Sequence, residues 1–382
     1  MKRSLSILAV LLCAFACIYP YHPAVEEAPE GILVIEGNLT VGDQATVRIG
    51  FLQSVWGEVT QKRYTLPADC AVWAEDDAAT RYPGVPDPDD ETRFTLALDQ
   101  APADRAYRLC VHAEGRDYSS DWATPLAAPV IKSVNFYPNE EKVFVYVSLD
   151  CSAAPSGYAV LSYDETWRFH ASFYPGYEYD AELDTVIGRI GEFERYWCWM
   201  TSDQENVFPL DYTLMKEPAI NDYPLLDFSR YSNRNHQRYS LQVKARTIDK
   251  ANYLYLNNLA QAQDNNDLFT PNPGEMQGNL RCDTDPDRMV LGYVTVSQIA
   301  RKRVFIGSEF LKVRALDPYE LSFPQKEEYA ETYERGYWPL VETAALWEDP
   351  QADRGDYAWG PPRCFDCTVN GGSLEKPDYW EE

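Results

Sequence analysis

The chain of 382 residues is poor in basic side chains, with 34 Lys and Arg against 60 Asp and Glu and a formal net charge of −26. An excess of negative charge repels nucleic acid and anionic lipid headgroups, so we exclude polyanion binding. After the N-terminal region, no run approaches the ~20 apolar residues that a membrane-spanning helix needs. Attachment to a membrane would therefore need an anchor other than a membrane-spanning helix.

Histidine is also scarce, and its pattern gives no support to common catalytic or metal sites. The four histidines are His22, His112, His170 and His236. None of them belongs to a metal-ligand spacing such as His-Glu-x-x-His, and the chain has no Gly-x-Ser-x-Gly nucleophile elbow. We therefore expect no metal, no cofactor and no catalytic residue, and a protein that binds rather than catalyses.

Residues 1–16 predict a signal peptide. Lys2 and Arg3 form a basic start, and the apolar stretch from Leu5 to Leu12 is too short to span a bilayer. Cys17 follows small residues and resembles the cysteine of a bacterial lipobox, whose thiol becomes lipidated. The alternative is an ordinary secretory signal with an incidental cysteine. We predict that lipid on Cys17 anchors an otherwise soluble protein to a membrane.

The remaining sequence favours β structure, because glycine, proline and tyrosine are plentiful while methionine is scarce. Residues 17–30 are rich in proline and glutamate and predict a lipid-anchored tether. Residues 31–127 contain short strand-like runs at the spacing of an immunoglobulin-like β-sandwich. Residues 128–382 predict a larger β-rich domain. The expected fold class is thus mainly β, with two domains.

Two helices are expected in the second domain. Asp249 can cap a helix near residues 249–263, whose apolar residues recur at helical spacing. A shorter helix near residues 324–334 would begin with Pro324 in its first turn and Ser322 near its cap.

Seven cysteines follow the proposed lipid site, and an exported chain meets an oxidising compartment. Cys364 and Cys367 form a Cys-x-x-Cys pair, but they lie between a Pro-Pro and a Gly-Gly dipeptide, which does not predict the helix N-terminus of a redox pair. A structural zinc that uses Cys198 or Cys282 is a second interpretation. We favour a structural disulfide from Cys364 or Cys367, with Cys198 as the first candidate partner and Cys282 as the second.

Aromatic side chains concentrate between Tyr163 and Trp199. Such rings stack on sugars and fill protein hot spots, although aromatic residues also favour strands and cores. Core packing is the favoured interpretation for most of them. The candidates for exposed, ligand-binding rings are Phe173, Tyr174, Tyr177 and Tyr179.

Several segments resemble those of a known family. They include Cys198-Trp199, Gln277-Gly278-Asn279, Leu291-Gly292-Tyr293 and the terminal Lys376-Pro377-Asp378-Tyr379-Trp380. With the lipid-site cysteine, they are similar to the Bacteroidota surface-lipoprotein family known as domain of unknown function 4249. The resemblance implies an outer-membrane lipoprotein, often encoded beside a TonB-dependent transporter, and it implies no activity.

These observations predict a non-catalytic lipoprotein of the outer membrane and the cell surface. Its expected partners are the membrane, through the lipid anchor, and a TonB-dependent transporter on which it docks or to which it hands ligand. A surface adhesin whose aromatic loops bind glycans is one alternative. A hydrolase acting on a surface polymer is another, and the sequence offers it no convincing acid/base pair.

Overall fold

The computed structural model describes residues 31–52, 66–154, 156–202, 206–264, 278–307, 321–346 and 356–381. The predicted signal peptide and tether, including Cys17, lie outside these ranges. The described chain confirms the predicted mainly β class, with two α-helices, α2 (Lys250–Asp264) and α3 (Tyr329–Glu334). Short 3-10 turns are η1 (Glu194–Tyr196), η2 (Asn233–Asn235), η6 (Lys326–Glu328), η7 (Thr343–Ala345) and η8 (Pro362–Cys364).

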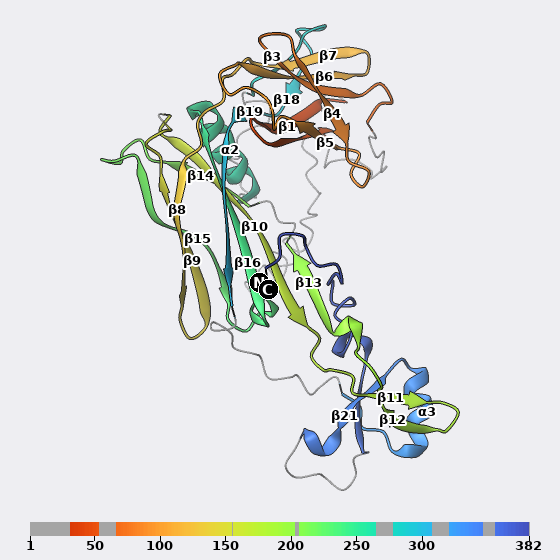
Figure 1. Cartoon of the computed structure of the whole chain (residues 1–382). Coiled ribbons are helices and arrows are strands. Elements are labelled where there is room, and N and C mark those ends of the chain that lie inside the picture. The colour runs from red at the N-terminus through yellow and green to blue at the C-terminus, as the bar shows by residue number, and fades with distance from the viewer. Residues whose placement is uncertain are drawn as a thin grey trace, which may run out of the picture.

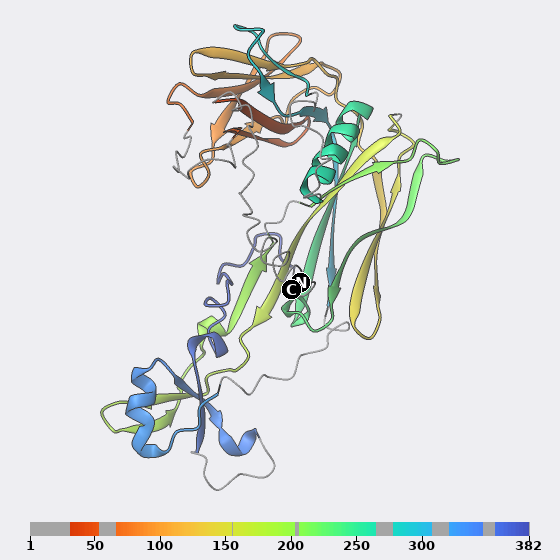
Figure 2. The same cartoon turned by 180° about the vertical axis from the view of Figure 1, so that it is seen from behind.

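The molecule is elongated (Figure 1). An N-terminal sheet forms one end, two sheets form the middle, and a small subdomain forms the other end. The view from behind shows α2 between the N-terminal sheet and the middle sheets (Figure 2).

The N-terminal sheet has ten strands from two parts of the chain. The first part supplies β1 (Leu33–Thr40), β2 (Gln44–Phe51), β3 (Ala71–Asp76), β4 (Arg81–Pro86), β5 (Arg93–Ala97), β6 (Tyr107–Ala113) and β7 (Arg116–Ser120). The second part supplies β17 (Leu280–Cys282), β18 (Val290–Leu291) and β19 (Val294–Ser297). Alternation along β2 buries Ala45, Val47 and Ile49 on one face, as the period of a half-buried strand requires.

This sheet crosses the domain boundary that the sequence predicts at residue 127. β17 pairs with β7, and β18 and β19 pair in parallel with β1. β4 pairs with both β3 and β5, so the strands form one continuous hydrogen-bonded sheet. Residues 31–127 therefore supply only part of the sheet, and the immunoglobulin-like sandwich stays a prediction.

Two further sheets share the core in the middle of the molecule. One has the order β15-β9-β8, with β8 (Val130–Pro138), β9 (Lys142–Asp150) and β15 (Ala219–Ser229). The other has the order β13-β10-β16-β20, with β10 (Tyr158–His170), β13 (Trp197–Thr201), β16 (Arg238–Ile248) and β20 (Ile299–Ile306), and β14 (Val207–Asp211) also pairs with β10. Val145, Leu161 and Leu241 are fully buried between the two sheets.

One nearly continuous strand passes from the N-terminal sheet into the middle of the molecule. β19 ends at Ser297 and β20 begins at Ile299, so Gln298 alone separates a strand of one sheet from a strand of the other. The Gln298 amide donates to the Leu126 carbonyl at 2.9 Å, which bonds this path to the segment that leaves the N-terminal sheet.

Helix α2 closes the same junction. Asp249 accepts a hydrogen bond from the Asn252 amide at 2.7 Å, which is the cap that the sequence predicts. The Tyr293 hydroxyl donates to Asp249 at 3.2 Å, and the Tyr255 hydroxyl donates to Glu36 on β1 at 3.2 Å. These contacts connect α2 to the N-terminal sheet.

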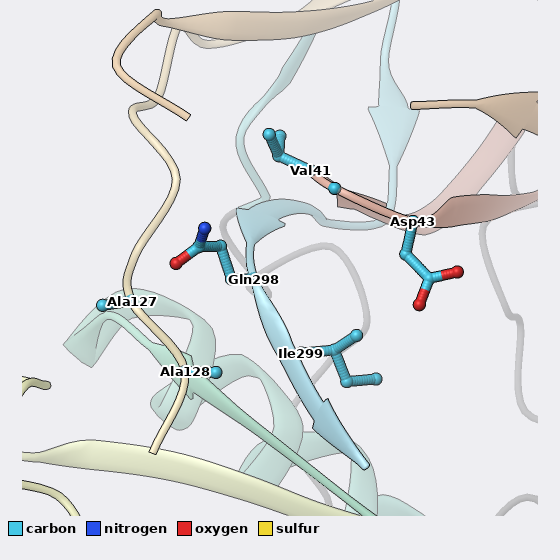
Figure 3. Close-up of a pocket in the computed structure, with 7 residues that line it drawn as sticks. Val41, Asp43, Ala127, Ala128, Gln298 and Ile299 are labelled. Carbon is cyan, nitrogen blue, oxygen red and sulfur yellow. The ribbon is translucent and has the colours of Figure 1, made fainter. Parts of the chain in front are cut away.

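A cavity of about 340 Å³ lies at the junction. Its lining residues are Val41, Gly42, Asp43, Ala127, Ala128, Gln298 and Ile299 (Figure 3). Asp43 is the charged member of this set, and it pairs with Arg301. Apart from the Gln298 amide, small or apolar residues form the rest of the wall, and we interpret the cavity as a packing gap between the two parts.

The end opposite the N-terminal sheet is the distal subdomain, which we define as residues 172–193, 321–346 and 356–366 (Figure 1). It contains the hairpin β11 (Tyr177–Asp180) and β12 (Thr185–Gly188), the pair β21 (Trp338–Glu342) and β22 (Tyr357–Gly360), and η6 with α3. Phe173, Leu340, Cys364 and Phe365 form its buried core.

The helix of the distal subdomain begins later than the sequence predicts. The Gln325 amide donates to the Glu328 carboxylate at 2.9 Å, so this pair marks the start of η6. Ser322 is not the cap residue, because the N-cap position is Gln325, and Ser322 instead exchanges backbone hydrogen bonds with Trp359 at 2.8 Å.

A disulfide holds the C-terminal segment on the middle sheets. It joins Cys198 on β13 to Cys367, with a Cα–Cα distance of 5.8 Å. Gly372 lies against this bond, and a Cβ atom there would be 2.4 Å from the Cys198 Cβ atom. Beyond it, Trp199 and Ser373 exchange backbone hydrogen bonds at 2.8 Å, and Trp380 is buried. The C-terminal segment is therefore part of the fold.

The first prediction concerns Gly292, which lies where β18 passes close to β1. Its φ is +114°, and a Cβ atom would lie 1.9 Å from the Ile35 carbonyl oxygen. We expect Gly292→Ala to lower the free energy of unfolding by roughly 2 kcal/mol or more, measured by chemical denaturation. Gly42→Ala is the matched control, because Gly42 has a φ of +88° and no atom within 4 Å of the added Cβ. Equal losses for the two variants would contradict the proposed clash.

The second prediction concerns the disulfide. Replacing both Cys198 and Cys367 with alanine should lower the free energy of unfolding by about 2–4 kcal/mol, because the bond closes a long loop in the unfolded chain. The control replaces Cys151 and Cys282, which are buried thiols outside any disulfide, with alanine. A similar loss in both double variants would attribute the effect to buried volume instead of to the covalent bond.

Candidate functional site

The distal subdomain contains all four aromatic residues that the sequence marks as candidate ligand contacts. Phe173 does not fit that expectation, because its ring is 6% exposed and packs in the subdomain core. Its amide also donates to the Cys364 carbonyl at 2.8 Å, which holds the two ends of the subdomain together. Phe173 is therefore a structural residue.

Tyr174 and Tyr177 lie nearer the surface. The Tyr174 ring is 42% exposed and meets the Tyr196 ring edge-on at 5.2 Å. The Tyr177 hydroxyl donates to Glu342 at 2.9 Å, and this contact raises the pKa of Tyr177. The Tyr174 ring is thus open to a partner, although its hydroxyl accepts the Phe193 amide at 3.2 Å, and the Tyr177 hydroxyl is engaged with Glu342.

Tyr179 connects the hairpin to the rest of the subdomain. Its ring packs against Tyr333 of α3 at 5.2 Å and Trp359 of β22 at 5.8 Å. Its hydroxyl donates to Asp184 at 2.5 Å, and this hydrogen bond raises the pKa of Tyr179 to about 12. The hydroxyl therefore stays protonated at neutral pH and fixes the hairpin turn.

The most exposed apolar side chains of the subdomain are not among the residues that the sequence predicts as ligand contacts. Ile190 is 97% exposed, Leu183 is 69% exposed and Ile187 is 37% exposed. Ile190 stands in a loop between Gly188 and Gly191, where an aliphatic residue has no core to join. That local mismatch is the signal by which the sequence could have identified it. We name Tyr174, Leu183, Ile187, Ile190 and Tyr333 the distal apolar residues.

A pocket of about 410 Å³ is lined in part by two of them, Ile187 and Tyr333. Its lining residues are Glu178, Tyr179, Asp180, Ala181, Glu182, Ile187, Arg189, Tyr333 and Trp338. The hairpin, α3 and β21 all contribute to the wall. The volume is within the usual range of small-ligand sites, roughly 300–1,000 Å³.

The Cys-x-x-Cys segment does not supply a second site. Cys364 is buried in the distal subdomain and lies outside the Cys198–Cys367 disulfide, and Cys282 is buried in the N-terminal sheet. Burial alone would raise the pKa of Asp366, but hydrogen bonds from Thr368 and Arg195 outweigh it and hold that pKa below its ordinary value. The segment is thus an anchored turn.

The middle sheets contain a buried ion pair that has a structural explanation. Glu165 is 4% exposed and accepts hydrogen bonds from Arg234 at 2.6 and 2.9 Å. The Tyr239 hydroxyl donates to the same carboxylate at 2.9 Å, and burial raises the pKa of Tyr239 well above its ordinary value. Since both carboxylate oxygens are satisfied, we assign this group to the core.

The described part of the chain offers neither a metal-ion cluster nor a membrane-spanning helix. Within it, no group of three or more His, Cys, Asp or Glu side chains is arranged to hold a metal ion. None of its helices combines the length and the apolar character needed to cross a bilayer.

Comparisons with known proteins identify the family but not an activity. No curated protein matches the chain. Among solved structures, a DUF4785 family protein from Legionella pneumophila is similar with 10% identity, 55% coverage of this chain, 51% coverage of that chain and a TM-score of 0.18. The present chain thus spans about half the length of that protein, and a likeness of this size carries no inference. Residues 18–303, more than half of the sequence, match the family described as Domain of unknown function (DUF4249), and the chain belongs to that family.

Proposed function

We propose that this protein is a non-catalytic lipoprotein of the Bacteroidota outer membrane that acts as an accessory or ligand-handling partner of a TonB-dependent transporter. In this proposal, lipid on Cys17 holds the chain at the cell surface, and the distal subdomain contacts the transporter. The observation that carries it is the exposure of the distal apolar residues, above all Ile190 at 97%. Exposed aliphatic and aromatic side chains gathered on one subdomain are typical of a protein contact surface.

The packed core that lies beneath the distal apolar residues is suited to binding a partner. The hairpin that carries Leu183 and Ile187 packs through Tyr179 on Trp359, a fully buried ring of β22. The Cys198–Cys367 disulfide lies where the chain leaves the subdomain for the C-terminal segment. A contact surface held by a packed core loses little conformational entropy on binding, which favours affinity.

A glycan-binding adhesin is the second candidate, and the aromatic rings of the pocket support it. Tyr333 and Trp338 provide rings in its wall, and Glu178, Asp180 and Glu182 provide hydrogen-bond acceptors. Rings and carboxylates around a small depression are suited to a sugar. In that case the same subdomain would bind a surface polysaccharide without a transporter.

The third prediction tests the anchor. Cys17→Ser should release the protein from the membrane fraction, because the substitution removes the thiol that would be lipidated. The measurement is the partition of the protein between membrane and soluble fractions after cell lysis. Cys13→Ser is the matched control, since Cys13 also lies in the signal region. Retention of Cys17→Ser in the membrane would overturn the lipid anchor.

The fourth prediction tests the contact surface. A photo-crosslinking amino acid placed at Ile190 should yield a covalent complex with a large outer-membrane protein in intact cells, identified by mass spectrometry. The matched control is Leu214, which is also 97% exposed but lies beyond β14, outside the distal subdomain. A complex formed from Leu214 and not from Ile190 would move the contact to another face. Crosslinking at neither position would contradict the proposed docking.

A further inference from the structure

The distal pocket has an unbalanced charge. Residues 177–188, which form the hairpin, carry Glu178, Asp180, Glu182 and Asp184 and no Lys, Arg or His. Three of these carboxylates line the pocket, and Arg189 is the cation among the lining residues. The wall thus has more negative than positive groups.

The structure neutralises only part of this charge. Arg189 pairs with Glu178 at 3.6 Å. Asp180 accepts the amides of Glu182 and Leu183 through Oδ1, at 2.9 and 3.1 Å, and this turn uses only one of its oxygens. In the ranges that the structure describes, neither Asp180 nor Glu182 forms an ion pair. Two carboxylates at the pocket therefore lack a cationic partner.

The rings of the pocket are suited to the same kind of group. The Arg189 guanidinium lies 5.2 Å from the ring centroids of both Phe193 and Trp338, so a planar cation already packs on aromatic rings here. Tyr333 lies on α3 and lines the pocket opposite the hairpin, and this residue is 38% exposed. A second cation can therefore contact Tyr333 while Asp180 and Glu182 supply the counter-charge.

Other ligand classes fit these groups less well. Unpaired carboxylates repel an anion, and a neutral sugar leaves their charge uncompensated. We propose that the distal pocket binds an organic cation of the guanidinium or alkylammonium class, as carried by arginine or lysine. This inference rests on the proposal that the distal subdomain is a contact surface, and it assigns the chemistry of the group that the partner inserts.

The test uses the full chain purified in a non-ionic detergent and isothermal titration calorimetry with two probes. The probes are argininamide and the blocked peptide Gly-Arg-Gly. Both should bind, and binding should weaken as the salt concentration rises because these charges are exposed. Tighter binding of the peptide would identify a polypeptide as the source of the cation, whereas equal binding would identify a free cation.

Matched variants separate charge from structure. The double variant Asp180→Asn and Glu182→Gln keeps the Oδ1 acceptor of the turn and should weaken binding about 5-fold or more. Tyr333→Ala should weaken it about 2- to 5-fold. Asp104→Asn, which removes an exposed carboxylate from the N-terminal sheet region, should bind like the unaltered protein.

Three results would overturn the inference. They are no binding of either probe, equal binding by the double variant and Asp104→Asn, or binding of a neutral oligosaccharide that depends on Tyr333 but not on the carboxylates. Failure of the proposed transporter contact is a separate outcome, because it is read from crosslinking at Ile190 in cells. Probe binding without such a crosslink would leave the pocket chemistry established and the docking proposal rejected.

Discussion

The passage of one strand between two sheets is the constraint on which the architecture depends. β19 pairs with β1 in the N-terminal sheet, and after Gln298 the same strand continues as β20 beside β16. An extended chain with one residue between two hydrogen-bonded ladders has few conformations open to it, so the two parts hold a fixed relation. The bonds from Gln298 to Leu126 and from Tyr255 to Glu36 add contacts around this passage.

The distal subdomain is held in place by a different kind of contact. The distal subdomain has a small core, which consists of a cluster of four buried residues and the buried rings of Tyr329 and Trp359 beside the hairpin. A core of this size contributes little hydrophobic stabilisation by itself. The Cys198–Cys367 disulfide and the exchanged hydrogen bonds between Trp199 and Ser373 secure the chain where it leaves the subdomain. A small subdomain can therefore remain ordered far from the main core.

Charge has separate roles in the core and at the distal end. In the middle sheets, Glu165 is buried and fully paired with Arg234 and Tyr239, which is the condition for burying a carboxylate at acceptable free energy. At the distal pocket, Asp180 and Glu182 are near solvent, where water stabilises an unpaired charge at little cost. At the distal pocket, unlike in the core, carboxylates without a cationic partner lie next to aromatic rings and apolar residues.

Local patterns in the sequence determined the mainly β class and many of its strands, because alternation and turn residues act over a few neighbours. They also determined the cap at Asp249, since a capping bond spans three residues. Only the tertiary structure decided that residues 280–297 complete the N-terminal sheet, that Phe173 is buried, and that Tyr333 and Trp338 meet the hairpin. Those outcomes depend on contacts between segments more than a hundred residues apart, and local propensity carries no information about such pairings.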